Sequence, residues 1–301
     1  MSSQSLSINQ NFIKAGEITR DVRKLVESRN WQGKTYLEIC NFVEDNIRGK
    51  GGAPAFPCNI CAGYSAAHYT AEIEDPKSVE SRTILKVDIG AQVDGFPADT
   101  SVTLCYDEDL FDLVDATRSA LSESLKVVKA GSRTSDVGRV VESYAARRGY
   151  IPIANLSGHS LDQYVVHSGT SVPNVWSPSS SSFRSDRVYA IEPFLTLKDG
   201  SGIVVEGKNA NIFSLITRKK LSDQKLNKLM ELIWTRCKTL PFAARWFAEE
   251  FSKAELDSSL KQLQKMKLIR SYPELLEAKQ RPVAQAEHTI ATSATGMTIL
   301  T

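Results

Sequence analysis

The sequence has 301 residues, of which 42% are hydrophobic and 24% are charged, a composition typical of water-soluble globular proteins. It contains no apolar run long enough for a membrane-spanning helix. A net charge of +2 indicates no nucleic-acid partner for the chain as a whole. Five cysteines in a chain of this length do not form a disulfide scaffold. Residues 1–12 lack the basic start and apolar core of a secretory signal, so we expect a reduced, cytoplasmic location.

The first half of the chain alternates between helical and strand patterns. The apolar spacing and the turn residues predict two helices within 9–48, a β-hairpin at 83–106, and amphipathic helices at 109–129 and 133–149. For the last of these helices, Thr134 or Ser135 is the expected N-cap and Gly149 the expected stop.

The second half begins with a region rich in strands and turns, residues 151–217. Three helical patterns follow, and they begin near Ser222, at Pro241 and near Lys253. Strand patterns return at 284–301. The order of elements predicts a mixed α/β protein with a helical block near its C-terminal end.

Charge separates this helical block from the rest of the chain. Residues 218–281 contain 15 Lys and Arg and 8 Asp and Glu, a net charge of +7. The remainder contains 22 basic and 27 acidic residues, a net charge of −5. We therefore predict an acidic body formed by residues 1–217 and 282–301, and a basic helical insertion formed by 218–281.

The predicted hairpin carries two aspartates inside apolar strands. Asp94-Gly95 is a favoured two-residue turn, which places Asp88 opposite Ser101 and Asp99 opposite Gly90. The two carboxylates then lie on one face, diagonal to each other and roughly 7 Å apart at the backbone. They would repel unless one is protonated or a cation lies between them. The pattern leaves two interpretations: a solvated edge, or a site for a divalent cation.

Other acidic and histidine residues occur in similar apolar contexts. In GHSLDQYVVHSG, an extended chain would place His159 and His167 on one face, although a lone histidine is more often buried and structural. Glu192 ends an apolar strand in YAIEPF, and Glu287 lies in QAEHTI; a single strand glutamate is usually solvated. The two aspartates, the two glutamates and one histidine could together hold two divalent ions and activate a water between them.

One Cys-x-x-Cys pair, CNIC at 58–61, is only half of a typical structural zinc site. A buried structural pair or an incidental redox pair is the preferred interpretation.

Several motifs, taken in order, resemble the type 2 methionine aminopeptidases, of the compact, archaeal-like kind. The resemblance covers nearly the whole chain and rests on AFP at 55–57, AAHYT at 66–70, VDIGAQVDGFPADTSVT at 87–103, GHSLDQYVVHSGTSVPN at 158–174, AIEPF at 190–194 and QAEHT at 285–289. It implies the pita-bread α/β fold, with pseudo-symmetric antiparallel sheets flanked by helices and a winged-helix-like insertion.

The resemblance also implies roles for individual residues. The five expected ligands of a dinuclear metal site are Asp88, Asp99, His159, Glu192 and Glu287, with Asp99 and Glu287 as the bridging pair. The expected histidines beside the substrate are His68, near the scissile bond, and His167, at the substrate carbonyl. The expected walls of the methionine pocket are Phe56, Val166, Phe194 and Tyr272. Glu192 is the candidate proton shuttle, because it would lie beside the bridging water.

The implied activity is removal of the initiator methionine from nascent polypeptides by a monomeric enzyme. The two ions could be Co, Mn, Fe or Zn, since such a donor set accepts all four. Association of the basic insertion with the ribosome is one further expectation, and a solvated helical face is the alternative. Two other functions stay open: a prolidase or Xaa-Pro aminopeptidase on the same fold, and a non-catalytic protein that binds ribosomal RNA or partners.

Overall fold

The structure is a computed structural model that describes residues 8–301. The first seven residues, which include most of the segment where we predict no secretory signal, lie outside the described part. The helices are α1 (Gln10–Glu27), α2 (Tyr36–Gly49), α3 (Phe111–Leu125), α4 (Thr134–Arg148), α5 (Gln224–Cys237) and α6 (Lys253–Lys265), with 3-10 turns η1 (Glu108–Leu110) and η2 (Ala244–Phe247). No helix within 8–301 has the length and apolar character needed to cross a membrane.

The strands form one long hairpin and several short antiparallel sheets. The first half contains β1 (Ala53–Pro54), β2 (Asn59–Ala62), β3 (Ser65–Ala67), β4 (Ile84–Val93), β5 (Phe96–Cys105), β6 (Tyr150–Pro152), β7 (Ser157–Leu161) and β8 (Ser171–Pro173). The second half contains β9 (Arg187–Ile191), β10 (Phe194–Leu197), β11 (Val204–Glu206), β12 (Ile212–Leu215), β13 (Phe242–Ala243), β14 (Ile269–Tyr272), β15 (Leu275–Glu277), β16 (Val283–Gln285), β17 (His288–Ser293) and β18 (Gly296–Ile299).

The hairpin of β4 and β5 has the predicted register. Asp94 and Gly95 both have positive φ, 50° and 85°, as a type I′ turn requires. Val93 pairs with Phe96, Asp88 with Ser101, and Gly90 with Asp99. The turn chemistry therefore places the two aspartates on one face, as the sequence predicts.

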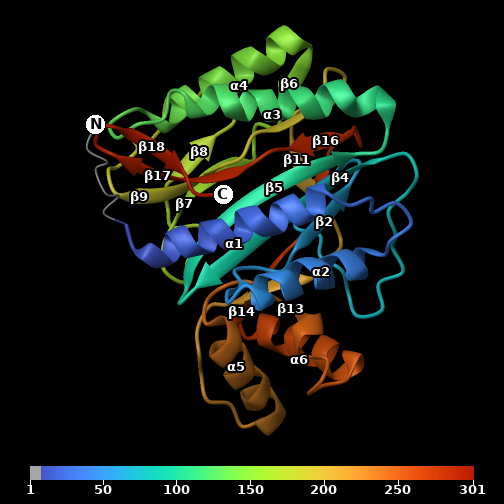
Figure 1. Ribbon diagram of the computed structural model, residues 1–301. Coiled ribbons are helices and arrows are strands. Elements are labelled where there is room, and N and C mark those ends of the chain that lie inside the picture. Colours follow the sequence, from blue (N-terminus) through green and yellow to red (C-terminus); the bar gives the residue numbers. More distant parts are fainter. Residues whose placement is uncertain (1–7) are drawn as a thin grey trace.

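The remaining sheets surround this hairpin in two halves. In Figure 1, α1 and α2 lie on one side of the strands and α3 and α4 on the other. β4 pairs with β5, β1 and β2, while the five-stranded sheet has the order β18-β17-β9-β7-β8. All pairings between strands are antiparallel. The expected α/β fold of antiparallel sheets flanked by helices is confirmed.

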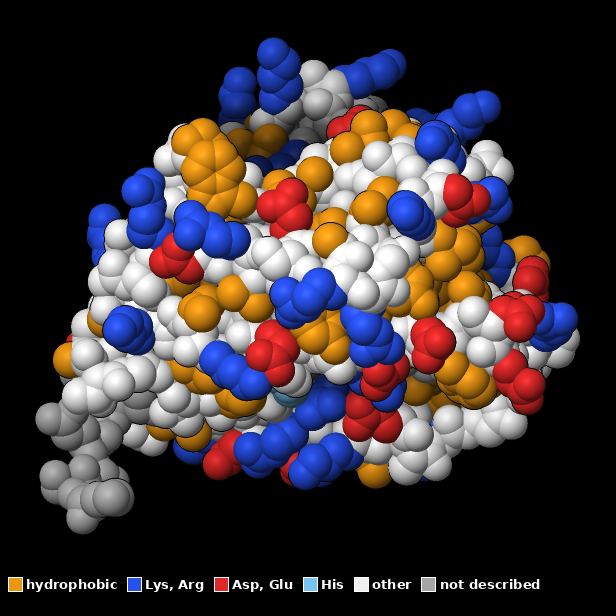
Figure 2. Space-filling model, turned by 90° about the horizontal axis from the view of Figure 1, so that it is seen from above, with side chains coloured by type: hydrophobic (Ala, Val, Ile, Leu, Met, Phe, Trp, Pro, Cys, Tyr) orange, Lys and Arg blue, Asp and Glu red, His pale blue; other side chains and the backbone are white. Residues whose placement is uncertain are grey.

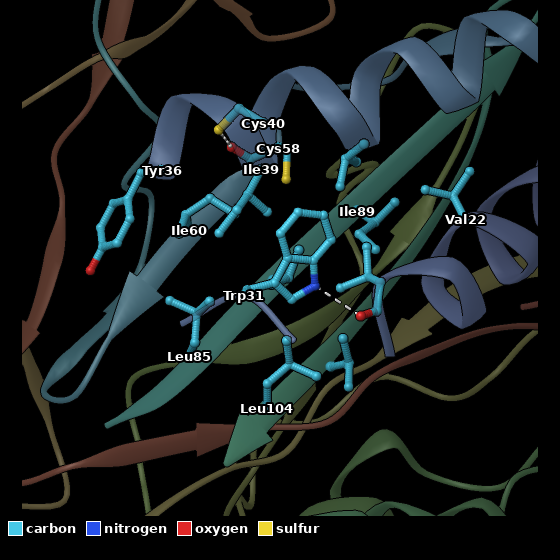
Figure 3. Close-up of a cluster of buried hydrophobic side chains, with 14 of the residues drawn as sticks. Val22, Trp31, Tyr36, Ile39, Cys40, Cys58, Ile60, Leu85, Ile89 and Leu104 are labelled. Atoms are coloured by element: carbon cyan, nitrogen blue, oxygen red, sulfur yellow. Dashed lines mark hydrogen bonds between the residues drawn. The ribbon is translucent and has the colours of Figure 1, made fainter. Parts of the chain in front are cut away.

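Trp31 occupies the centre of the apolar core beneath α1 and α2 (Figure 3). Only 4% of its surface is exposed, and its indole N–H donates to the carbonyl of Val26 at 2.9 Å. A buried indole needs such an acceptor, because an unbonded N–H in an apolar core is costly. This core fixes the outer face of β4, so that its inner face is held toward the centre of the molecule.

Two helix predictions need correction. The helix expected at Pro241 is absent: Phe242 and Ala243 pair with β12 as β13, and only the 3-10 turn η2 follows. The N-cap of α4 is Arg133, with Thr134 and Ser135 inside the helix. Arg133 stays extended because it forms a β-bridge with Ser182, so tertiary pairing overrides the local capping preference. Gly149 ends the helix with φ of 81°, as predicted.

The insertion packs α5 and α6 over the small sheet β13-β12-β14, around its own apolar cluster. Figure 1 shows it projecting below the body, beyond α2. β12 precedes the boundary that charge predicts at residue 217, yet it pairs with strands of the insertion. The division into two domains stays a prediction.

Candidate metal centre

Asp88 and Asp99 face the interior from neighbouring positions on β4 and β5. Asp99 is 4% exposed, and each aspartate has one buried carboxylate oxygen without a hydrogen-bond partner. Burial raises the pKa of Asp88 to about 7. Burial and the nearby charges of Asp88 and Glu192 also raise the pKa of Asp99. The hairpin therefore holds two carboxyl groups in a position that disfavours their negative charge.

His159 lies on β7, close to the carboxylate of Asp99. Its Nε2 is 3.7 Å from Asp99 Oδ2 and 3.3 Å from Glu192 Oε1. The preceding Gly158 is necessary, because a Cβ there would overlap the carbonyl of Ala190 on β9. Burial lowers the pKa of His159 well below its usual value, helped by the neighbouring His167. The imidazole is therefore neutral and available as a metal ligand.

Glu192 and Glu287 complete the cluster from the ends of two strands. Glu192 directly follows β9, and Glu287 directly precedes β17. Glu287 has one buried oxygen without a partner, while its backbone carbonyl accepts from Thr100 Oγ1 at 2.7 Å. Burial first, and then the neighbouring negative charges, raise the pKa of both glutamates.

The donor set fits divalent cations. One ligand atom from each of Asp99, His159 and Glu287 lies within 4.8 Å of the others. In the described part of the chain, no Lys or Arg forms an ion pair with the four carboxylates; His159 lies beside Asp99 and Glu192, and Gln285 Nε2 donates to Glu287 Oε2 at 3.4 Å. Buried carboxylates without a counter-ion are unfavourable, and hard oxygen donors with one imidazole are typical of divalent metal sites. The cluster thus has suitable donor atoms for a cation, and a bound cation would compensate its buried negative charge.

His167 reaches the cluster by a turn, and not by the alternation of side chains along one extended strand. Asp162 and Val165 form a β-bridge, and the amide of Ser168 donates back to the carbonyl of Ser160 at 2.8 Å. The reversal brings the rings of His159 and His167 to 4.0 Å. Burial and the charge of Arg270 lower the pKa of His167, so it is a neutral donor near pH 7.

His68 lines the same cavity in a strained conformation, with φ of 65°. Its ring lies 5.9 Å from the ring of Tyr272. Burial lowers its pKa to about 4, with a smaller contribution from His167. A positive φ is unfavourable for a residue with a Cβ, and such strain is often found where a side chain must be aimed.

A cavity of about 540 Å³ opens above the cluster. It includes every expected pocket residue: Phe56, Val166, Phe194 and Tyr272. Phe56 packs over β4 because Gly90 lacks a Cβ, which would overlap the phenyl ring. The apolar walls beside the carboxylates suit an unbranched apolar side chain.

Several lining residues were not predicted from sequence: Asn59, Asn155, Leu156, Ile212, Leu215, Thr239 and Arg270. Asn59 pairs with Asp88 across β2 and β4, which a predicted register could have shown. The residues from β12, β14 and the 239–241 segment carry no local signal, because only the pairing of β12 with strands of the insertion shows that these segments lie together. Cys58 and Cys61 are buried free thiols outside the cavity lining.

Comparisons with known proteins identify the family of the chain. The model of "Metallopeptidase family M24" matches residues 10–212. The chain is 40% identical over 93% of its length to a methionine aminopeptidase from Saccharolobus solfataricus, with 93% of that protein covered. It is 39% identical over 96% of its length to one from Thermococcus onnurineus, with 98% covered.

Solved structures share the fold at low sequence identity. One titled "Structure of a thermophilic Arx1" has a TM-score of 0.83 at 15% identity. The match covers 98% of this chain and 91% of the Arx1 chain. A methionine aminopeptidase from Thermotoga maritima has a TM-score of 0.70 at 19% identity, and covers 98% of both chains. A prolidase from Pyrococcus furiosus has a TM-score of 0.62 at 14% identity, with 62% of that chain covered.

These findings, with the buried carboxylate and histidine cluster, define a metal-dependent peptidase of the pita-bread fold. The chain belongs to metallopeptidase family M24, and within it to the methionine aminopeptidases.

Proposed function

We propose that the protein removes the N-terminal methionine from peptides and nascent proteins, with two divalent ions held by Asp88, Asp99, His159, Glu192 and Glu287. One observation carries the proposal: three of these carboxylates have buried oxygens without partners, and the cluster borders an apolar cavity of about 540 Å³. Relatives of nearly full length are methionine aminopeptidases, which supports the same substrate.

Bound divalent ions would supply a nucleophilic water at neutral pH and polarise the substrate carbonyl. Glu192 is the group that accepts the proton of this water and passes it to the leaving amine. Its position supports the role, because it lies 3.3 Å from His159 Nε2 and lines the cavity.

The histidines act on the substrate rather than on the ions. His167 donates a hydrogen bond to the oxygen that becomes negative during attack. It can do so as a neutral imidazole, since its pKa is lowered by burial. His68 lines the cavity as well and contacts the region of the scissile bond. Phe56, Val166, Phe194 and Tyr272 enclose the thioether side chain, whose flexible, polarizable sulfur suits aromatic walls.

Hydrolysis of Met-Ala-Ser, measured beside Ala-Pro-Ala, tests this function. The protein should first be stripped of metal and then supplied with Mn, Co, Fe or Zn. We expect release of methionine that depends on the added ion, and little cleavage of the proline peptide. Faster cleavage of Ala-Pro-Ala would favour a prolidase. Metal binding without any hydrolysis would favour a non-catalytic protein.

We also propose that the protein works as a monomer in the cytoplasm. Its five cysteines are free thiols, which suits a reducing compartment. On the face shown in Figure 2, basic and acidic side chains are interspersed among apolar ones. Light scattering of the purified protein should give a mass near 33.2 kDa; a stable dimer would contradict the monomer.

The insertion is our candidate for contact with the ribosome. Arg218, Lys219 and Lys220 line a hollow of about 380 Å³ on its surface. Lys219 and Lys220 are exposed, and neither forms a salt bridge with any described residue. Basic side chains of this kind bind phosphates. Replacing both lysines by glutamine should weaken salt-dependent sedimentation with ribosomes; unchanged sedimentation would contradict the proposal and favour a solvated face.

A further inference from the structure

Arg270 is the only Lys or Arg among the described residues that line the active-site cavity. The acidic residues of the same lining, Asp88, Asp99 and Glu192, are assigned above to the metal centre. Arg270 itself is exposed, so it stands at the mouth of the cavity. Its positive charge therefore has no assigned role in the chemistry.

The guanidinium of Arg270 is held on the insertion side of the mouth. Arg270 and Ser214 are direct partners across β14 and β12, and Arg270 Nε donates to Ser214 Oγ at 3.1 Å. Ser214 Oγ is also 3.0 Å from the hydroxyl of Tyr272, whose ring centroid lies 6.0 Å from the guanidinium carbon. One nitrogen thus anchors the side chain beside a wall of the methionine pocket.

The two terminal nitrogens of Arg270 are left for a ligand. Arg270 forms no salt bridge with any residue of the described part, 8–301, whereas many other arginines of this chain do. A guanidinium with two free terminal nitrogens matches a carboxylate in a bidentate arrangement.

The path of a bound peptide leads past this side chain. The free amine and first carbonyl of the substrate belong at the buried cluster, and the methionine side chain belongs between the apolar walls. The rest of the peptide must leave through the open mouth, past His167 and Arg270. Each extended residue advances roughly 3.3 Å, so the third and fourth residues come within reach of a long arginine side chain.

We infer that Arg270 binds a substrate carboxylate beyond the scissile bond, and so gives the enzyme a preference for acidic over basic residues near the start of the chain. The inference rests on the proposed function and adds a specificity determinant to it. The carboxylate has two sources: an acidic side chain at the third or fourth position, or the C-terminal carboxylate of a short peptide.

Steady-state kinetics with matched peptides test the inference. The first arm compares Met-Ala-Glu-Ser-amide with Met-Ala-Lys-Ser-amide, and Met-Ala-Ser-Glu-amide with Met-Ala-Ser-Lys-amide. The second compares Met-Ala-Ser with its C-terminal amide. For the wild type we expect the carboxylate-bearing peptide to have a kcat/KM about 5-fold higher in at least one arm, mainly through KM, as a partly exposed ion pair would give. High salt should reduce the ratio.

Arg270→Glu should reverse the preference to about the same extent, and Arg270→Gln should remove it. The matched control is Lys265→Glu, which makes the same change in net charge on α6, outside the cavity lining. It should keep the wild-type ratio. A response in either arm supports the inference and identifies the source of the carboxylate.

The inference is overturned if Arg270→Glu keeps the wild-type ratio in both arms, or if Lys265→Glu changes the ratio equally. Failure of the wild type to cleave any of these methionine peptides, including the neutral amide, would instead overturn the proposed function on which it depends.

Discussion

Glu44 is as deeply buried as Asp99 and Glu287 of the metal centre but differs from them in its partners. Glu44, on α2, is 1% exposed. Its Oε1 accepts from Arg245 and from the amide of Cys58, and its Oε2 accepts from Trp246 Nε1 at 2.7 Å. In contrast, Asp88, Asp99 and Glu287 each have a buried oxygen with no partner at all.

The comparison shows that burial alone does not identify a functional carboxylate. A buried carboxylate whose oxygens are all bonded has a structural role: here Glu44 joins α2 to Arg245 and Trp246 of the insertion. Buried carboxylates with unsatisfied oxygens raise the free energy of the protein unless a ligand compensates them. Such groups are therefore candidates for a ligand site.

The largest expected effect is the loss of activity when a proposed metal ligand is removed. Asp99→Ala and Glu287→Ala should abolish cleavage of Met-Ala-Ser. Losing a residue that only supports a metal ligand costs up to about 100-fold in activity, so losing a ligand itself should lower turnover by more than that. Both variants should also lose bound metal, measured by elemental analysis. A variant that keeps its metal and its wild-type rate would show that the carboxylates with unbonded oxygens are no more functional than Glu44.

Glu44→Ala should have the opposite pattern, a large loss of stability with metal retained. It leaves the buried guanidinium of Arg245 without its counter-ion, and breaking such a pair costs about 3–5 kcal/mol. Urea denaturation measures the loss, and elemental analysis of the folded protein checks the metal. Glu44→Gln, which keeps one oxygen acceptor, is the control and should be less destabilised. An unchanged free energy of unfolding would contradict the structural role.

His167→Ala should lower turnover by about 10²–10³-fold, the usual effect of removing one donor to a developing oxyanion. Because His167 is not a proposed ligand, the metal content should stay at the wild-type level. Turnover of Met-Ala-Ser at saturating metal is the measurement. Wild-type turnover would exclude His167 from this role, and loss of metal would place it among the ligands.

The smallest expected effect is a pH dependence of the stability of the metal-free protein. The pKa of Asp88 is raised to about 7 in the folded state, against about 4 in an unfolded chain. The folded state therefore binds a proton that the unfolded chain has released, and this stabilisation is lost as pH rises from about 4 through 7. Relative to Asp88→Asn, the metal-free wild type should lose up to about 1.4 kcal/mol per pH unit in this window.

Denaturant melts of both chelator-treated proteins at pH 5, 6 and 7 measure this difference. A difference in stability that does not depend on pH would mean that the Asp88 carboxyl does not titrate in the predicted window. Added metal should reverse the trend, because metal ions compete with protons for the same oxygens.

The hairpin could be predicted to the exact pairing because its register depends on a two-residue turn. Asp94-Gly95 determines which residues face each other, and this is local information. The same holds for Gly149, whose positive φ ends α4. The apolar strand contexts suggested a set of carboxylates and a histidine that could hold two ions, and the family resemblance assigned this role to Asp88, Asp99, His159, Glu192 and Glu287.

Features that depend on distant partners could not be predicted. Pro241 has the local signature of a helix start, but pairing of the next two residues with β12 prevents the helix. His167 approaches His159 through a turn that alternation does not reveal. Glu44 looks like an ordinary helix residue until Arg245 is placed beside it, 201 positions away in sequence.

Metal titration of the wild type tests the central claim most directly. Protein stripped with chelator and titrated with Mn²⁺ in a calorimeter should bind two equivalents per chain, and cleavage of Met-Ala-Ser should return as the ions bind. Binding of no metal, or of two equivalents by Asp99→Ala as well as by the wild type, would contradict a dinuclear centre built on these carboxylates.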